Sequence, residues 1–254
     1  MDIDIKNAEM EFIRYTERYN LKNENILRKQ QHSLRVMKNC KQIARDLKCN
    51  EEQIKIAELI GLLHDIARFK QYTEYKHFND LKSFDHGNFG AEILEIDLRK
   101  YIIDERFDEL IKIAIKNHNK YQIEDGLTEE QKLFCKIIRD ADKTDILYEA
   151  TGIFWNGKEK EIEKLTISKE ILEYITNEET YKRNINKELN LLENVIAVIT
   201  MIYDINYKIS FEIIAERNYI SKILNRFDIK GNETKKYIQE IEKKTNAFIK
   251  KKIS

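Results

Sequence analysis

Histidine and aspartate side chains that can bind a divalent metal ion occur in a regular order along this 254-residue sequence. The order is one histidine, an adjacent His-Asp pair, two further histidines and a late aspartate. The residues are His32, His64, Asp65, His86, His118 and Asp142. Imidazole and carboxylate ligands together suit ions such as Mn, Fe, Ni, Zn or Mg. The pattern therefore predicts a metal site that leaves coordination positions open for water and substrate.

These candidate ligands fall on helices predicted from the spacing of apolar residues. The predicted helices cover residues 25–47, 51–69, 86–97, 107–119 and 128–150. A helical bundle can place one ligand from each helix around a common centre. Neighbouring residues on a helix diverge by about 100°. His64 and Asp65 would thus reach the centre from different directions, and the two oxygens of Asp65 could bridge two ions.

We expect two overlapping ligand sets. The first ion would be held by His32, His64, Asp65 and Asp142. The second ion would be held by Asp65, His86 and His118. Several of these residues end apolar helical faces, where a polar group needs a partner, and a metal ion is one way to supply it.

The composition predicts an all-α fold. The sequence contains no proline and only seven glycines, whereas average usage would give roughly a dozen prolines. Further helices are expected over residues 4–19, 168–176, 184–206, 210–227 and 232–251. The sequence Thr128-Glu129-Glu130-Gln131 is typical of a capping box at a helix start. Residues 70–85 are aromatic, polar and poorly periodic, and are interpreted as a long loop.

No linker separates the two halves of the chain. We therefore expect one all-α domain over residues 1–254, with a metal-binding core at about 25–150 and a C-terminal helical extension at about 158–254. No internal repeat or low-complexity tract is visible.

Charge and cysteine usage narrow the class of protein. The 45 basic and 45 acidic side chains cancel, which argues against nucleic acid or a membrane surface as partner. The lysines between residues 243 and 252 fit a solvated helix face, with a nucleic-acid arm as the alternative. Cys40, Cys49 and Cys135 lack CxxC spacing, which argues against a disulfide scaffold or a zinc finger.

The longest apolar run, residues 195–203, is too short to span a bilayer. A cytoplasmic protein with reduced thiols is expected.

Four sequence blocks resemble the HD superfamily of metal-dependent phosphohydrolases. The blocks are residues 32–36, 62–68, 85–94 and 137–143, with the sequences HSLRV, LLHDIAR, DHGNFGAEIL and IIRDADK. The sequence Asn117-His118-Asn119 falls where the binuclear branch has its late histidine. The resemblance covers roughly residues 25–150.

The resemblance implies an all-α fold, one or two divalent metal ions, and hydrolysis of a phosphoester or phosphoanhydride. His32, His64, Asp65 and Asp142 match the ligands common to the family. His86 and His118 match the extra pair of binuclear members. Arg68 and Lys143 fall where family members place basic residues near the substrate phosphate.

Departures from the family pattern narrow the possible substrates. No Gly-Tyr-Pro follows His118, which argues against the branch that hydrolyses cyclic di-GMP. No Glu-Asp pair follows Asp65 as in the alarmone hydrolases. His77, in the polar loop, is interpreted as structural or exposed, with substrate contact as the alternative.

The expected activity is hydrolysis of a small phosphorylated substrate, a nucleotide by family analogy. A metal-bound hydroxide would attack phosphorus, with Asp65, Arg68 and Lys143 as the catalytic residues. The competing hypothesis is a non-catalytic module of the same fold that binds a nucleotide or regulates a partner. Oligomeric state, substrate and native metal are left open.

Overall fold

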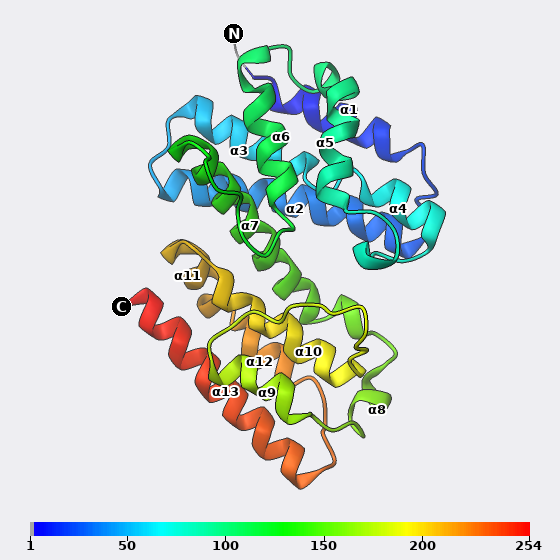
Figure 1. Ribbon diagram of the computed structural model, residues 1–254, viewed down its shortest axis with the longest axis vertical. Helices are drawn as coiled ribbons and strands as arrows, with labels where there is room; N and C mark the ends of the chain where they lie inside the picture. The colour runs from blue at the N-terminus through cyan, green and yellow to red at the C-terminus, as the bar shows by residue number, and fades with distance from the viewer. Residues whose placement is uncertain (1–2) are drawn as a thin grey trace. The chain divides into compact units, whose positions relative to one another are not determined.

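The computed structural model describes residues 3–254, which contain α-helices and short 3-10 helices but no β-strand (Figure 1). This confirms the predicted all-α fold. The chain divides into two compact units, residues 1–142 and residues 143–254. The division falls inside helix α7 (Glu129–Ala150). That both units form a single domain stays a prediction.

The first unit carries all five histidines. Helix α2 lies along α3, and α5 lies along α6 (Figure 1). The elements are α1 (Ile5–Thr16), α2 (Glu24–Asp46), α3 (Glu51–Leu63), α4 (Arg68–Tyr75), η1 (Asp80–Lys82), α5 (His86–Asp97), η2 (Leu98–Lys100), η3 (Glu105–Phe107), α6 (Asp108–Asn117) and the first part of α7.

Helices α2 and α3 pack closely together at Gly61. A Cβ atom there would lie 2.8 Å from the Cys40 Sγ and 2.9 Å from the Met37 Cα. A glycine at this position therefore lets the two backbones meet. The neighbouring side chains Val36 and Leu59 are fully buried, so the helix that carries His32 and the helix that precedes His64 share an apolar interface.

Side-chain caps define where several helices begin. Thr128 and Gln131 exchange hydrogen bonds with each other's backbone N–H groups, which confirms the predicted capping box. Asn50 and Gln53 form the same motif at the start of α3. The Asp85 carboxylate accepts from the Asn88 N–H at 2.8 Å and so caps α5. Each cap satisfies backbone donors that the first helical turn leaves without partners.

Four predicted elements differ from the structure. The helix expected over residues 51–69 ends at Leu63, and the expected loop at 70–85 contains α4 and η1. The helix expected over 184–206 begins only at Leu191. The one expected over 210–227 is interrupted at Asn218, whose φ of 52° is left-handed. Asparagine tolerates this conformation better than most residues, and apolar periodicity alone does not detect such a break.

The second unit contains the elements η4 (Ile153–Trp155), α8 (Glu159–Ile162), α9 (Lys169–Thr176), α10 (Leu191–Ile199), η5 (Thr200–Asp204), α11 (Lys208–Glu216), α12 (Tyr219–Leu224) and α13 (Asn232–Ile253). Helix α13 packs against α9, α11 and α12. The core of the second unit is built from aliphatic and aromatic side chains, among them Ile196, Ile199 and Phe211.

The long helices of both units are amphipathic. Helix α2 buries Val36, Met37 and Ile43, and α13 buries Ile241 and Phe248 on one side. Among residues 3–254, no helix is both long enough and apolar enough to cross a bilayer.

Candidate metal centre

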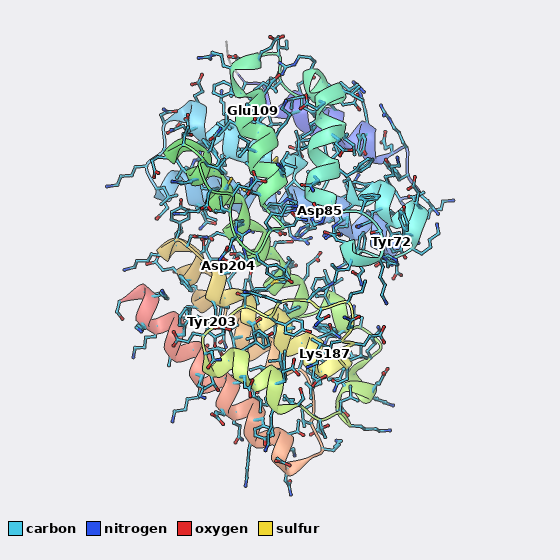
Figure 2. The ribbon with its side chains drawn as sticks, viewed as in Figure 1. Tyr72, Asp85, Glu109, Lys187, Tyr203 and Asp204 are labelled. Atoms are coloured by element: carbon cyan, nitrogen blue, oxygen red, sulfur yellow. The ribbon has the colours of Figure 1, made fainter. Side chains whose placement is uncertain are left out.

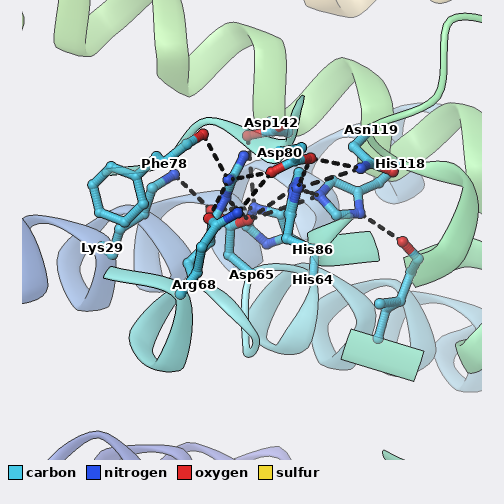
Figure 3. A network of polar contacts seen from close by, with 12 residues as sticks. Lys29, His64, Asp65, Arg68, Phe78, Asp80, His86, His118, Asn119 and Asp142 are labelled. Carbon is cyan, nitrogen blue, oxygen red and sulfur yellow. Dashed lines mark hydrogen bonds and ion pairs between the residues drawn. The ribbon is translucent and has the colours of Figure 1, made fainter. Parts of the chain in front are cut away.

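The six candidate ligands meet inside the first unit, and all but Asp142 lie at under 5% exposure. His32 and Asp142 lie within helices α2 and α7. His64 and His118 directly follow the last residues of α3 and α6, and His86 is the first residue of α5. The centre is thus assembled mainly at helix ends, as the close-up in Figure 3 shows.

Asp65 lies in the turn that separates α3 from α4. The Ile66 N–H donates to the Leu63 carbonyl and the Arg68 N–H donates to the Asp65 carbonyl, which tightens the chain after α3. The expected continuous helix over this pair is therefore wrong. His64 and Asp65 diverge because the chain turns here, not because they are neighbours on one helix.

One side of the centre joins His32, His64 and Asp142. The Asp142 Oδ1 lies 3.0 Å from the His32 Nε2 and 3.6 Å from the His64 Nε2. The two Nε2 atoms are 3.3 Å apart. The ligand atoms of these three residues all lie within 4.8 Å of one another, which is close enough for one ion.

Asp65 faces two pairs of histidines with its two oxygens. Its Oδ2 lies 3.5 Å from the Nε2 of His32 and 3.5 Å from that of His64. Its Oδ1 lies 3.4 Å from the His86 Nε2 and 3.8 Å from the His118 Nε2. This arrangement brings the two expected ligand sets together with Asp65 between them.

Contacts at Nδ1 direct the Nε2 atoms of three histidines toward the centre, where those of His86 and His118 lie 2.9 Å apart. The Nδ1 atoms of His64 and His118 lie 2.8 Å and 2.6 Å from the carbonyl oxygens of Gly61 and Ile115. The His86 Nδ1 lies 2.5 Å from the Asp80 carboxylate. Carbonyls and ionised carboxylates only accept, so each Nδ1 donates. In a neutral ring the Nε2 is then bare, and these atoms converge with the carboxylates of Asp65 and Asp142 in a set of lone pairs that fits a cation.

Burial and neighbouring charges set the protonation states of the ligands. Burial lowers the pKa of His64, and burial together with Arg68 lowers the pKa of His86 to about 3. Burial alone would raise the pKa of Asp65, but Lys29 and His64 hold it well below its usual range. Neutral imidazole and ionised carboxylate are the forms that bind divalent metals.

Two side chains that the sequence patterns did not single out contact this centre. The Lys29 Nζ donates to the Asp65 Oδ2 at 2.6 Å. Asp80, in η1, accepts from His86 and lies 2.7 Å from the Arg68 guanidinium. Lys29 lies three residues before His32, on the same face of α2, and this spacing is the sequence signal that could have found it. Asp80 lies in a stretch interpreted as loop, where no periodicity marks it.

The two predicted phosphate-binding residues have different surroundings. Arg68 belongs to the network of Figure 3: its guanidinium also donates to the Phe78 carbonyl at 2.9 Å, and its Nε lies 3.5 Å from the Asp65 Oδ1. Lys143 forms an ion pair with Asp204, the two side chains being 2.9 Å apart within the second unit (Asp204 is labelled in Figure 2). Their roles in catalysis stay predictions.

Arg139 anchors the backbone that carries His118. Its guanidinium is buried and donates to the carbonyls of Asn117, Lys120 and Tyr121. Carbonyls after a helix C-terminus lack helical partners. Arg139 satisfies them and holds the end of α6 in place. It lies in the block with Asp142, but its type alone did not reveal this role.

His77 lies apart from the converging ligands. Its Nδ1 accepts from the Asn79 N–H at 3.2 Å, and its ring packs near that of Tyr75. These contacts fit the interpretation as a structural residue.

Comparison with known proteins identifies the segment that holds this centre. The HD domain family model matches residues 30–147. This segment of the chain is therefore an HD domain, a family of all-α proteins that bind divalent metals and are mostly metal-dependent hydrolases. No curated protein and no solved structure matches the chain significantly.

Proposed function

We propose that this chain is a metal-dependent phosphohydrolase that cleaves a phosphoester or phosphoanhydride of a small molecule, with a nucleotide as the substrate class. The observation that supports it most is the convergence of the Nε2 atoms of four histidines on the carboxylates of Asp65 and Asp142. Lone pairs repel one another at these distances unless a cation lies among them. Such a buried arrangement is costly for a purely structural bundle.

The ligands divide into two sets that share Asp65. His32, His64 and Asp142 would hold one ion, and His86 and His118 the other, with one Asp65 oxygen facing each set. Bound divalent ions would supply a water of lowered pKa and would neutralise charge on phosphoryl oxygens. The lowered pKa values of Asp65 and Asp142 keep both carboxylates ionised at neutral pH, and the lowered pKa values of His64 and His86 keep both imidazoles neutral.

The charge of the network favours an anionic substrate. Asp65, Asp80 and Asp142 carry three negative charges, and Lys29 and Arg68 carry two positive charges. This leaves a single negative charge, so even one divalent ion makes the centre positive and two make it strongly so. A phosphate group, or several linked phosphates, would restore neutrality. The choice of a nucleotide rests on family analogy alone.

Metal analysis and a hydrolysis panel test the proposal. Protein stripped with a chelator is reloaded with Mn, Fe, Ni or Mg and assayed against mononucleotides, dinucleoside polyphosphates and cyclic nucleotides. We expect about one to two equivalents of bound ion and turnover of at least one substrate class. The double variant His64→Ala with Asp65→Ala should lose both metal and turnover while its helical circular dichroism persists.

A matched control is His77→Gln, which removes the one histidine outside the centre and should leave metal content and turnover unchanged. Bound metal without turnover on any substrate would contradict the proposal and favour the non-catalytic, regulatory module. A wild-type protein that binds no divalent ion would contradict both.

A further inference from the structure

Asp80 is held by donors from several separate segments of the first unit. Its carboxylate accepts from the Arg68 guanidinium at 2.7 Å, from the Gln71 amide at 2.9 Å and from the Asn119 amide at 3.2 Å. Its contact with the His86 Nδ1 measures 2.5 Å, which is shorter than the 3.3 Å between that nitrogen and the Asn119 amide nitrogen. These partners come from α4, the start of α5 and the residues after α6, and Figure 3 shows the side chains gathered around Asp80.

His86 needs such a partner because of where it lies. His64 and His118 follow the ends of helices, where unpaired carbonyls three residues earlier accept from their Nδ1 atoms. His86 opens α5, and a helix start offers backbone donors instead of acceptors. The backbone of α5 therefore offers no acceptor that would hold a proton on the His86 Nδ1, and a side chain from outside the helix has to accept it.

We propose that Asp80 is a positioning residue that fixes the Nδ1-protonated tautomer of His86 and aims its bare Nε2 at the shared carboxylate Asp65. This inference rests on the proposed function, because the ion that His86 would bind belongs to that centre. The partners of Asp80 are Arg68, Gln71, His86 and Asn119, and it acts on the centre through His86. A carboxylate behind a ligating histidine sets both ring orientation and ligand basicity.

The two sides of the centre consequently differ in how they are held. The Nδ1 of His64 is fixed by the backbone of α3 itself. The Nδ1 of His86 depends on the η1 segment and on the Arg68 and Gln71 side chains that hold Asp80. Loss of Asp80 should therefore weaken the ion bound by His86 and His118 and spare the ion bound by His32, His64 and Asp142.

The first experiment measures tautomers in the metal-free protein by long-range ¹⁵N–¹H NMR of the histidine rings. Only five histidines contribute signals. In the wild type we expect His86 to be protonated at Nδ1. In Asp80→Asn the amide can either accept or donate, so a signal from Nε2-protonated His86 should appear. Asp80→Ala, which removes the partner altogether, should show the same change, while the signals of His64 stay as they are.

The second experiment measures Mn²⁺ binding by titration calorimetry. Asp80→Asn should weaken one of two binding events by about 10–100-fold, the usual effect of losing such a partner. The control is Asp104→Asn, a carboxylate of the same unit whose partner is Arg106 and not a residue of the centre; it should leave both binding events unchanged.

Three results would overturn the proposal: a wild-type His86 protonated at Nε2, tautomers unchanged in both Asp80 variants, or equal weakening of both binding events. A wild-type protein that binds no Mn²⁺ contradicts the proposed function instead. In that case the tautomers of the metal-free protein still decide whether Asp80 positions His86.

Discussion

The two units of this chain use their interiors differently. The first buries imidazoles and carboxylates at its centre, whereas the principal core of the second is a continuous cluster of aliphatic and aromatic side chains. All five histidines and all three cysteines precede residue 143. Apolar burial stabilises a fold without further partners, while buried ionisable groups need an ion or a hydrogen bond. The comparison therefore contrasts a unit whose central ionisable groups would be stabilised by a bound ion with a unit held mainly by apolar burial.

The largest expected effect comes from the apolar core of the second unit. Phe211 is almost completely buried, and Phe211→Ala should reduce the free energy of unfolding by about 3–5 kcal/mol through lost burial and a residual cavity. Urea denaturation followed by circular dichroism measures it. Without urea, the variant should keep its full metal content. Loss of metal from the folded variant would show that the metal centre of the first unit depends on the apolar core of the second.

Metal addition should stabilise the first unit selectively. At about 100 times its dissociation constant, an ion that binds only the folded state adds about 2.7 kcal/mol. Hydrogen exchange should slow in α2, α3, α5 and α6, which carry or precede the ligands, and change little in α10 and α13. The double variant His64→Ala with Asp65→Ala should show no slowing. Equal slowing of hydrogen exchange in both units would contradict a selective effect of the metal on the first unit.

Replacement of Arg139 tests how the first unit holds its ligands in place. Arg139→Met keeps most of the volume but leaves the carbonyls after α6 without their donor, at an expected cost of about 1–3 kcal/mol. Hydrogen exchange near His118 should accelerate, and Mn²⁺ affinity should fall. Arg139→Lys replaces the planar guanidinium with a single ammonium group. Its Mn²⁺ affinity should lie between those of the wild type and Arg139→Met. Unchanged Mn²⁺ affinity in Arg139→Met would separate helix anchoring from metal binding.

The smallest effect is expected at a polar cap of the second unit. The Glu193 carboxylate accepts from the N–H groups of Ser168 and Asn190, each at 3.1 Å. Glu193→Ala should cost about 1 kcal/mol, and Glu193→Gln, which can still accept, should cost less. Burial would raise the pKa of Glu193, but these hydrogen bonds lower it.

The sign of its pH dependence follows from that lowered pKa. The carboxylate stabilises the fold above the ordinary glutamate pKa, and this contribution is lost as the pH falls through the lowered value. The stability difference between wild type and Glu193→Gln should therefore shrink in acid. A difference that grows on acidification would contradict this account.

Local patterns predicted most helices of both units because caps and apolar spacing act within a few residues. The capping box at Thr128 and the helix over residues 86–97 agree with the structure. The patterns failed where the chain turns without a glycine or proline signal. The turn at His64 and Asp65 and the left-handed Asn218 are the clearest cases.

The types and order of the ligands are properties of the sequence, and they predicted an all-α HD domain with His32, His64, Asp65, His86, His118 and Asp142 as ligands. The partners that hold those ligands could not be predicted from the sequence, because they come from other segments of the chain. Lys29 reaches Asp65 from 36 residues away, and Arg139 reaches the end of α6 from α7. Only the tertiary structure places Asp80 behind His86, since a helix start cannot supply the acceptor that its Nδ1 requires.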